Sequence, residues 1–339
     1  DISASKQLNY RHFGNMNVLT LLFLAVLTSA IKIHRPYLIE KANEFFEEFI
    51  TTFNKHYADD AEKAKRFEIF KKNLELINQK NLESKSDVHG ITKFSDLTNE
   101  EFIAMYTGLR RSILRQGSEC TAGSANTTSA PDSWSWKDKG VISKAKDQDQ
   151  CGSCWAFSAI GNVEAHYAMK HKKLLDLSEQ QLVDCDMRSS CSGTDNMEYP
   201  FLYLIENSGA MKEKDYPYQG TREKCKFNPS KVKVKVEDCI SYTPKTEEEL
   251  KDIVYSTGPV SIDINGWHGY TQGVLEICPV DELNHAVLLV GYGTENGTPY
   301  WLIKNSFGES FGENGFIKIK RGVNACGLME EGAIGVVVS

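Results

Sequence analysis

Apolar residues in the front part of the chain recur every three to four positions between residues 37 and 81. This spacing places them on one face of a helix and predicts two successive amphipathic helices. Farther on, Thr98 is followed three residues later by Glu101, which is the pattern of a capping box and predicts a third helix ending near Gly108. The apolar positions are Phe45, Phe46, Phe49, Ile50 and Phe53 in the first helix and Phe67, Phe70, Leu74 and Ile77 in the second.

The back part of the chain changes from helical to β patterning. Strict alternation and one continuous apolar run, both typical of strands, appear only after several helical segments. A helical part followed by a β-rich part indicates an α+β protein with two subdomains. Helices are expected at residues 154–170, 178–184 and 199–207, and strands at residues 231–236, 284–290 and 316–319.

The most apolar segment covers residues 18–27 and is shorter than the roughly 20 residues that a membrane-spanning helix needs. We therefore expect no membrane span. With Met16 before it and small residues ending at Ala30 after it, the segment predicts a signal peptide over residues 16–30. Residues 1–15 are then upstream sequence, and entry into the secretory pathway is expected.

A second boundary is predicted at residues 117–130, which are small, polar and almost uncharged. Such a stretch is typical of an exposed linker that proteases cut. It contains a glycosylation sequon at Asn126. The linker separates a leader at residues 31–129 from a main domain at residues 130–339.

Composition narrows the function further. The chain has 339 residues, of which 41% are hydrophobic and 25% charged, as in ordinary globular proteins of two or three domains. Its formal net charge of -7 argues against a nucleic-acid partner, because nucleic-acid binders normally carry a basic excess. The nine cysteines are an odd number, so at least one thiol has no intramolecular partner.

The main candidate for chemistry is the segment Cys151-Gly152-Ser153-Cys154-Trp155. A cysteine in this context, with a histidine and an asparagine about 130 to 150 residues downstream, is the signature of a cysteine-protease nucleophile. His285 follows Cys154 by 131 residues and Asn305 follows it by 151. The spacing therefore predicts a catalytic Cys154, His285 and Asn305.

Each of these residues has a physical role in that chemistry. Cys154 is expected at a helix N-terminus, where the helix dipole and a histidinium stabilise a thiolate. His285 would take the thiol proton and give it to the leaving amine, while Asn305 would orient the imidazole. The side-chain amide of Gln148 and the Cys154 backbone N–H would stabilise the oxyanion of the tetrahedral intermediate.

These residues have two other interpretations. A Cys-x-x-Cys pair is also found in zinc sites and redox motifs, but the chain has no second pair to complete a zinc site. A single histidine before an apolar strand is usually structural. The combination of His285 with Asn305 and the Cys154 motif favours the catalytic interpretation over both.

With these motifs the chain resembles a papain-family cysteine protease zymogen of the cathepsin L or F type, from about residue 37 to the end. Residues 284–293 and 324–327 are especially similar to the viral cathepsins of baculoviruses. The resemblance implies an α+β papain-like fold, in which a helical subdomain and an antiparallel β-barrel-like subdomain flank the cleft. It also implies a helical inhibitory propeptide, whose motif residues are Glu62, Arg66, Phe70, Asn73, Ile77, Asn81, Gly90, Phe94 and Asp96.

The resemblance further implies the disulfides. The family pattern pairs Cys151 with Cys191, Cys185 with Cys225, and Cys278 with Cys326. It leaves Cys154 for catalysis and Cys120 and Cys239 without assigned partners. Because Cys120 lies in the linker, we expect it to be lost or mispaired without effect on the enzyme.

The chain also departs from the family pattern. Phe307 and Phe311 stand where the family has tryptophans after the active-site asparagine, so activity should be reduced rather than abolished. Thr194 stands where a second glycine normally allows close pairing with the substrate backbone, which puts peptide affinity in question. Glu331, five residues after Cys326, corresponds to the floor of a specificity pocket and would admit Arg besides large apolar side chains. Substrate-binding residues are thus expected to be Gly152, Gly193, Thr194, Leu283, Ala286 and Glu331.

These observations predict a secreted or endolysosomal cysteine endopeptidase that acts on proteins and peptides without a cofactor. Its propeptide would act as an intramolecular inhibitor and leave at acidic pH, when carboxylates such as Asp96 lose their charge. Processing in the linker would give a monomeric enzyme that begins near Ala130. The alternatives are a non-catalytic binding protein of the same fold and an inhibitor whose functional part is the leader.

Overall fold

The computed structural model describes residues 36–110, 119–125, 129–278 and 283–339. The expected signal peptide at residues 16–30, the upstream residues 1–15 and the sequon at Asn126 lie outside the described residues. Within the described part, no helix is long and apolar enough to cross a membrane.

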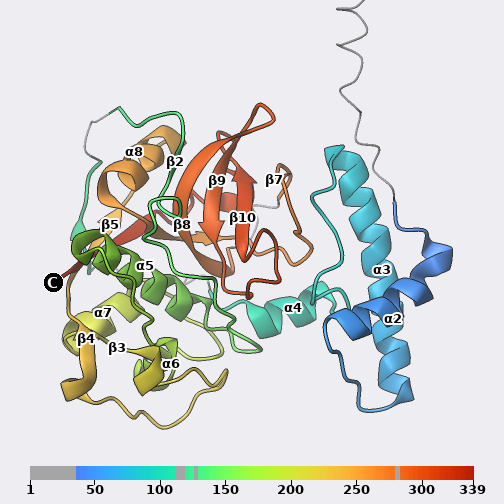
Figure 1. Ribbon diagram of the computed structural model, residues 1–339, viewed down its shortest axis with the longest axis horizontal. Coiled ribbons are helices and arrows are strands. Elements are labelled where there is room, and N and C mark those ends of the chain that lie inside the picture. The colour runs from blue at the N-terminus through green and yellow to red at the C-terminus, as the bar shows by residue number, and fades with distance from the viewer. Residues whose placement is uncertain (1–35, 111–118, 126–128, 279–282) are drawn as a thin grey trace, which may run out of the picture. The chain divides into compact units, whose positions relative to one another are not determined.

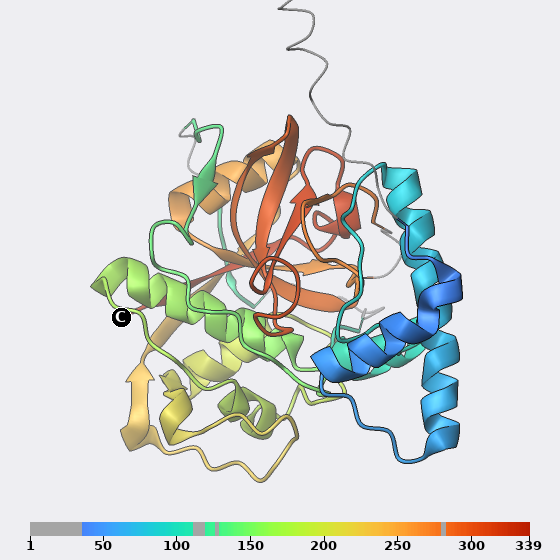
Figure 2. The ribbon, with the colours of Figure 1, turned by 45° about the vertical axis from the view of Figure 1, so that its right-hand side comes forward.

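The leader folds as a small helical unit that we call the prosegment, residues 36–110. Its two predicted amphipathic helices form, and Figures 1 and 2 show α2 lying across α3. Asp59 caps α3 by accepting a hydrogen bond from the Glu62 backbone N–H, and Lys85 ends it in a left-handed conformation. The buried core between α2 and α3 includes Phe46, Phe49, Phe70 and Leu74. The elements are η1 (Ile39–Lys41), α2 (Ala42–Thr52) and α3 (Asp60–Ser84).

The capping box predicted at Thr98 begins α4 (Asn99–Tyr106). The Thr98 side chain accepts from the Glu101 N–H at 3.2 Å, and the Glu101 carboxylate accepts from the Thr98 N–H at 3.0 Å. The helix ends at Tyr106, two residues before the predicted end near Gly108. Figure 1 places α4 between α3 and the rest of the chain.

A helical subdomain follows the prosegment along the chain and is built around α5 (Cys154–His171). Almost every residue in the first half of α5 is buried, because other elements pack around it. Ile160 and Val163 of α5 belong to the same core as Leu182 and Phe201 from the neighbouring helices. The other elements are α6 (Glu179–Cys185), α7 (Tyr199–Glu206), η2 (Glu213–Asp215), η3 (Pro229–Lys231), and the paired strands β3 (Ala210–Met211) and β4 (Val232–Val234).

The second subdomain is a sheet whose described strands follow the order β1-β5-β11-β6-β8-β9-β10-β7, with β2 paired to β8. The expected α+β fold with two subdomains is confirmed, and most described strand pairs are antiparallel. The expected barrel-like form differs in two respects: the strand order does not close on itself, and β1–β5 and β10–β7 are parallel pairs. Its members are β1 (Thr121–Ala122), β2 (Trp134–Ser135), β5 (Val236–Tyr242), β6 (Val260–Ile264), β7 (Val274–Leu275), β8 (His285–Glu295), β9 (Thr298–Lys304), β10 (Phe316–Lys320) and β11 (Ala333–Val338), with α8 (Glu247–Thr257) and η4 (Ala325–Gly327) beside them.

The alternating segment at residues 231–236 does not form the single strand that was predicted. Pro229 begins a short 3-10 helix that includes Lys231. The rest of the segment divides between β4, which pairs with β3, and Val236, the first residue of β5 in the larger sheet. Alternation alone cannot identify the point at which a chain passes from one sheet to another.

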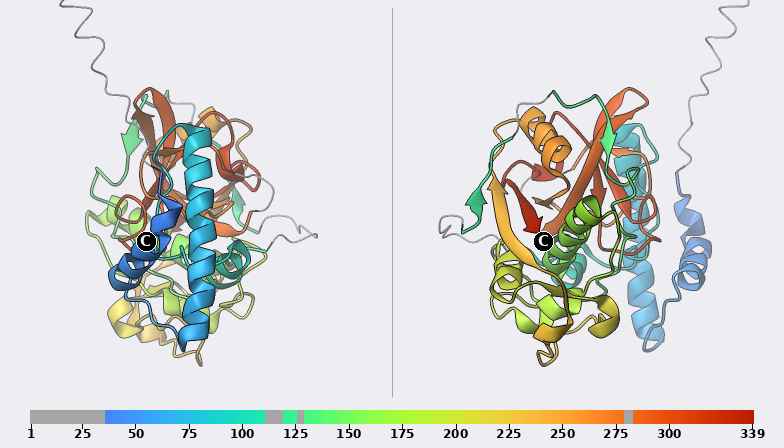
Figure 3. Two further views of the ribbon diagram at one scale, coloured as in Figure 1. Left: turned by 90° about the vertical axis from the view of Figure 1, so that its right-hand side faces the viewer. Right: turned by 60° about the vertical axis from the view of Figure 1, so that its left-hand side comes forward.

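The predicted linker is partly an ordered strand. Thr121 and Ala122 pair in parallel with Ile240 and Ser241 of β5, and the right-hand view of Figure 3 shows β1 beside β5. Cys120 forms a disulfide with Cys239. The expectation that Cys120 is mispaired is therefore wrong. Most of residues 119–125 are exposed, as expected of a linker, but the segment is attached to the sheet.

The other disulfides are the three that the family pattern implies. They join Cys151 to Cys191, Cys185 to Cys225, and Cys278 to Cys326. All nine cysteines lie in the described residues, and among them only Cys154 has a free thiol.

A buried group of charges joins the two subdomains. Lys146 lies 3.3 Å from Glu164 of α5, 2.9 Å from Glu179 of α6 and 2.7 Å from Asp176. Lys304, at the end of β9, lies 4.0 Å from the same Glu164. Burial raises the pKa of Glu179 to about 8 and lowers the pKa of Lys304. Lys304 directly precedes Asn305, so this group supports the strand end that carries a candidate site residue.

Candidate active site

Cys154 is the first residue of α5 and is completely buried. The backbone N–H groups of Ala156 and Phe157 both donate to the Ser153 carbonyl, which starts the helix just before the thiol. Cys154 thus occupies the helix N-terminus, where the partial positive charge of the dipole favours an anion. The local sequence therefore places this thiol where a thiolate is stabilised.

His285 and Asn305 come together from neighbouring strands. His285 begins β8, Asn305 follows β9, and their Nε2 and Oδ1 atoms are 2.7 Å apart. An amide oxygen only accepts, so Nε2 carries the hydrogen and Nδ1 is the nitrogen left to exchange a proton. The Ser306 N–H also donates to Asn305 Oδ1, at 2.8 Å, which fixes the amide in this orientation.

The environment suppresses the charges of both reactive groups in this state. Burial raises the pKa of the Cys154 thiol to about 12, against the lowering effect of the Ala286 and Gly108 backbone. Burial likewise lowers the pKa of His285 to about 4, although its bond to Asn305 acts in the opposite direction. The structure therefore holds a neutral thiol and a neutral imidazole at neutral pH.

Gln148 contributes the side-chain amide expected at an oxyanion site. Its Nε2 donates to the Tyr106 carbonyl at 3.0 Å and to the Cys151 carbonyl at 2.8 Å. The Ser306 hydroxyl donates to Gln148 Oε1 at 2.6 Å and orients the amide. A carbonyl oxygen of the prosegment thus occupies one of the donor directions of Gln148.

Aromatic rings cover the His285–Asn305 hydrogen bond. The Phe307 ring stacks on the imidazole with centroids 4.8 Å apart, and Phe311 meets Phe307 edge-on at 5.2 Å. Both phenylalanines are almost fully buried. Phe can therefore occupy the position where the family has Trp and still exclude water from the bond.

The end of the prosegment runs across these residues as an extended chain. The N–H groups of Gly108 and Leu109 donate to the Asn284 carbonyl at 3.1 and 3.0 Å. The Thr194 N–H donates to the Gly108 carbonyl at 2.7 Å, and the Arg110 N–H donates to the Thr194 carbonyl at 2.8 Å. Leu109 and Thr194 form a parallel bridge. The prosegment therefore pairs with the backbone of Asn284 and Thr194, two residues that adjoin or belong to the predicted substrate-binding set.

The close approach of this chain depends on glycines. A Cβ at Gly108 would lie 1.8 Å from the Gly152 carbonyl oxygen, and a Cβ at Gly193 would lie 2.4 Å from the Gly108 carbonyl oxygen. Thr194, in contrast, is buried, and its Oγ1 donates to the Asn196 carbonyl at 3.0 Å. The hydroxyl is thus engaged within the loop while the Thr194 backbone pairs with the prosegment. Thr194 therefore does not prevent backbone pairing with the prosegment, and its effect on peptide affinity stays a prediction.

The remaining predicted binding residues differ in how closely they approach this site. Leu283 is buried directly before Asn284, and Ala286 is buried directly after His285. Glu331 is half-buried in the turn between η4 and β11, away in sequence from the catalytic residues. Its role in a specificity pocket stays a prediction.

The first prosegment motif holds the prosegment together. Arg66 pairs with Glu101 at 2.7 Å and donates to the Asp96 carbonyl at 3.2 Å, while its Nε lies 3.8 Å from Glu62. Asn73 donates to the carbonyls of Ser95 and Leu97, at 2.8 Å each. These bonds tie α3 to the turn before α4. Ile77 is buried in α3, and Asn81 exchanges hydrogen bonds with the His89 backbone.

Asp96 has its side-chain contacts within the prosegment. Its carboxylate pairs with Lys55 at 2.8 Å and accepts from the Tyr57 hydroxyl at 3.0 Å. The Asp96 carboxylate therefore stabilises the fold of the prosegment itself, and its expected role in acid release stays a prediction.

The second motif docks the prosegment on the sheet. The Gly90 N–H donates to the Gly269 carbonyl at 2.9 Å, and a Cβ at Gly90 would lie 2.9 Å from Thr271 Cγ2. The Phe94 ring meets Phe307 and Phe311, with centroids at 5.1 and 5.8 Å. The prosegment thus contacts the same rings that cover the His285–Asn305 hydrogen bond.

Family models match both parts of the chain. A model described as papain family cysteine protease matches residues 130–336, and one described as cathepsin propeptide inhibitor domain (I29) matches residues 46–102. The chain belongs to the papain family of cysteine proteases. Its Cys154, His285 and Asn305 come from the matched region of this protease.

Relatives and solved structures agree with this assignment. The protease is 42% identical to the viral cathepsin of Heliothis zea nuclear polyhedrosis virus over 320 residues, which covers 89% of this chain and 87% of the relative. It is 41% identical to the viral cathepsin of Adoxophyes honmai nucleopolyhedrovirus over 317 residues, or 90% and 94%. It is similar to digestive procathepsin L2 from Tenebrio molitor larval midgut, with a TM-score of 0.80, 32% identity and coverage of 87% of this chain and 99% of that one.

Sequence reasoning missed several residues of the site and of the prosegment contact. Ser306, whose hydroxyl orients Gln148, directly follows Asn305, but no motif in the sequence marks it. The Trp267 indole N–H donates to His89 Nδ1 at 2.9 Å, and Lys80 lies 4.3 Å above the Trp267 ring. Lys93 of the prosegment also pairs with Asp147 next to Gln148. No motif in the sequence connects His89 with Trp267 or Lys93 with Asp147.

Proposed function

We propose that the protease is an endopeptidase that hydrolyses peptide bonds through a thioester on Cys154. The thiolate attacks the scissile carbonyl carbon, and the oxyanion that forms accepts hydrogen bonds from Gln148 and the Cys154 N–H. The C–N bond then breaks as the His285 imidazolium gives its proton to the leaving amine. Water, deprotonated by His285, attacks the thioester and releases the acid and the thiol.

One observation carries this proposal. A peptide carbonyl, that of Tyr106, accepts a hydrogen bond from Gln148, while the next residues of the prosegment pair with Asn284 and Thr194. The same backbone groups and amide would hold a substrate over Cys154. His285 and Asn305, 2.7 Å apart, supply the base and its orienting group.

The precursor is held inactive by its own prosegment. Burial beneath residues 107–110 keeps Cys154 and His285 uncharged, and the prosegment chain fills the substrate path. In this proposal residues 16–30 direct the chain into the secretory pathway, residues 31–129 inhibit it, and processing near Ala130 yields a monomeric enzyme. The disulfides favour an oxidising compartment, either an endolysosome or the extracellular space.

Substrate preference follows from Glu331. A carboxylate at the floor of the pocket that receives the residue two positions before the scissile bond would pair with Arg. Large apolar side chains would be accepted beside it. Proteins and peptides are therefore the proposed substrates, and no cofactor takes part in the mechanism.

The test is intact-mass analysis of the precursor after incubation at acidic pH with an epoxysuccinyl thiol-protease inhibitor. After the disulfides have been reduced, the expected result is a shortened chain that carries one adduct, mapped to Cys154. The Cys154→Ala variant, shortened by an added protease, should carry none. A wild-type chain that stays unlabelled after its prosegment has been removed would contradict the proposed mechanism.

A further inference from the structure

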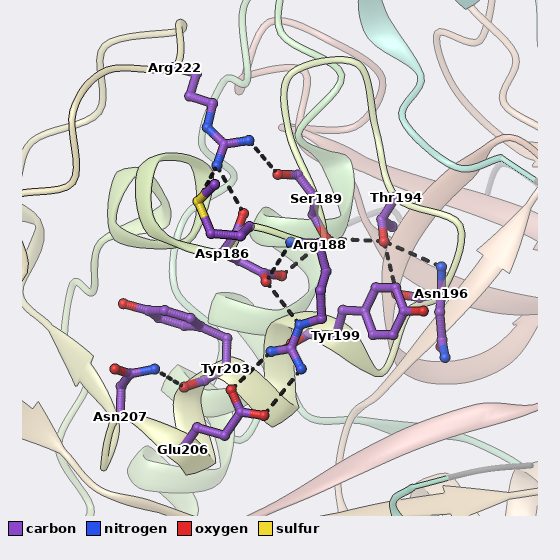
Figure 4. Close-up of polar contacts among 11 residues, drawn as sticks. Asp186, Arg188, Ser189, Thr194, Asn196, Tyr199, Tyr203, Glu206, Asn207 and Arg222 are labelled. Atoms are coloured by element: carbon purple, nitrogen blue, oxygen red, sulfur yellow. Dashed lines mark hydrogen bonds and ion pairs between the residues drawn. The ribbon is translucent and has the colours of Figure 1, made fainter. Parts of the chain in front are cut away.

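The loop that ends at Thr194 carries a hydrogen-bonded chain of side chains behind the peptide-binding backbone. Ser189 Oγ lies 3.1 Å from both Asp186 Oδ2 and Thr194 Oγ1 (Figure 4). On its other side, Thr194 Oγ1 donates to the Asn196 carbonyl at 3.0 Å and accepts from the Asn196 N–H at 3.3 Å. The Thr194 hydroxyl thus has partners in Ser189 and Asn196, while the backbone of the same residue pairs with the prosegment.

This series of hydrogen-bonded side chains is anchored by a buried carboxylate. Asp186 is 1% exposed and accepts from both the backbone N–H and the Nε of Arg188, at 3.1 Å each. Arg188 reaches on to both carboxylate oxygens of Glu206 at 3.2 and 3.3 Å. A bidentate pair of this kind fixes an arginine more firmly than a single contact does. Figure 4 shows Arg188 between Asp186 and Glu206.

A second arginine closes the loop from the opposite side. Arg222 donates to the Ser189 carbonyl at 2.9 Å and to the Asp186 carbonyl at 3.2 Å. The loop is also bounded by disulfides, since Cys185 and Cys191 are both bonded to cysteines outside it. These restraints leave the Thr194 backbone little freedom to rotate.

We propose that Thr194 is a positioning residue for the peptide substrate. Its hydroxyl, which contacts Ser189 and donates to the Asn196 carbonyl, fixes the N–H and C=O groups that pair with an extended peptide in the cleft. A glycine at this place would leave the same backbone freer, because glycine has the widest range of backbone conformations. Thr194, which stands where the family has glycine, therefore preorganises the backbone N–H and C=O groups that bind the peptide.

This inference rests on the proposed endopeptidase function and is tested on the activated enzyme with a fluorogenic peptide. The Thr194→Val variant keeps the shape and loses the hydroxyl, so KM should rise about three- to ten-fold. Because Cys154 and His285 are untouched, kcat should stay within about twofold. Thr194→Ser restores the hydroxyl and should restore KM, and Ser189→Ala should raise KM as Thr194→Val does.

The exposed Thr243→Val is the matched control and should match the wild type. Active-site titration gives the concentration of competent enzyme, so loss of folded protein does not enter kcat or KM. An unchanged KM in both Thr194→Val and Ser189→Ala, or an equal rise in Thr194→Ser, would overturn the proposal. Absence of turnover in the wild type would instead count against the proposed function.

A separate observation concerns residues 119–125, which are bound to the sheet by more than their disulfide. The Glu119 N–H donates to Glu198 Oε2 at 2.8 Å, and the Gly123 N–H donates to the Ser241 carbonyl at 2.8 Å. A Cβ at Gly123 would lie 2.4 Å from both Ile240 Cγ2 and Tyr242 Cε1, so the fit depends on glycine. The segment occupies the outer side of β5, which would otherwise be the sheet edge in the described strand order.

We infer that residues 119–125 remain part of the active protease. Whichever side of the segment is cut, the Cys120–Cys239 bond keeps it on β5. If the chain is cut after the segment, near Ala130, the prosegment itself stays tethered to the enzyme until that disulfide is reduced. Covalent tethering then keeps the inhibitor at high effective concentration.

The test is a peptide map of the activated protease, digested without reduction. The expected result is a peptide containing Cys120 joined to one containing Cys239. Activated protease that lacks Cys120 and has an alkylatable thiol at Cys239 would overturn the inference. If the precursor does not activate itself, an added protease makes the cut and the same map decides.

Discussion

Phe307 lies face to face with the imidazole of His285, with the ring centroids 4.8 Å apart and an interplanar angle of 21°. The ring covers the hydrogen bond that orients the catalytic base. Phe307→Ala should therefore lower kcat about tenfold, because water then competes for the His285–Asn305 bond and the imidazole loses its orientation. Phe307→Trp, which restores the larger ring of the family, should match or exceed the wild-type kcat.

The measurement is kcat per titrated active site, which corrects for the packing that Phe307→Ala also disturbs. Phe227→Ala, far from the site in sequence, is the aromatic control and should leave kcat unchanged. Equal kcat values for Phe307→Ala and the wild type would show that the ring has no role in orienting His285.

Acid release of the prosegment should depend on His89. Burial lowers the pKa of His89 to about 4, as it does for His268 on the enzyme side, and nearby Lys80 adds to both shifts. A released histidine has an ordinary pKa near 6.5, so it takes up a proton that the docked one resists. Docking is thus fully stable above about pH 6.5 and weakens as the pH falls toward 4. Protonation of His89 Nδ1 also removes the acceptor of the Trp267 N–H, which can only donate, so this hydrogen bond is lost.

His89→Gln keeps an acceptor for Trp267 and removes the titration. We expect the pH midpoint of precursor activation to fall by about half a unit or more. His56→Gln, an exposed histidine of the same prosegment, should leave the midpoint in place. A midpoint that does not move in His89→Gln would contradict a role for His89 in acid release.

Lys146 should be essential for stability because Glu164 and Glu179, each at most 2% exposed, depend on it. Lys146→Met leaves these carboxylates buried without their main counter-charge, which should cost about 3 to 5 kcal/mol of unfolding free energy. Denaturant unfolding in a Cys154→Ala background gives this value without self-digestion. Lys144→Met, whose side chain is 85% exposed, should change stability by less than about 0.5 kcal/mol. A similar small change for both variants would contradict this role.

The preference for Arg should depend on Glu331. Glu331→Gln should lower kcat/KM for a peptide with Arg two positions before the scissile bond by about tenfold, and leave a Leu peptide nearly unchanged. Glu330→Gln is the neighbouring control and should change neither rate. Equal Arg-to-Leu ratios in Glu331→Gln and the wild type would place Glu331 outside the pocket.

Local signals in the sequence were sufficient for the helices and for the candidate catalytic residues. The capping box at Thr98 and the apolar face through Phe70 and Leu74 depend on neighbours within a few residues, so they can be read directly from the chain. The spacing of Cys154, His285 and Asn305 also predicted a pair, His285 and Asn305, that the fold joins by a hydrogen bond, and a cysteine that begins a helix. The helices follow from motifs of a few residues, whereas the catalytic roles of these three residues stay predictions.

Contacts between distant segments could not be predicted in this way. The pairing of β1 with β5 and the bond from Cys120 to Cys239 require a fold in which residues 119 positions apart meet. A small, polar segment is equally typical of an exposed linker. The same holds for the contact between His89 and Trp267, which depends on how the prosegment packs against the enzyme.

The central claim is that Cys154 is a thiolate nucleophile in the active protease and is silenced in the precursor by burial. The most direct test is the rate at which iodoacetamide alkylates Cys154 at pH 6, measured by mass spectrometry on precursor and activated enzyme. The account predicts that activation raises this rate at least about 100-fold, because the thiol pKa falls from about 12 into the acidic range once the cleft opens. Equal rates for the two forms, with Cys154 intact in both, would contradict it.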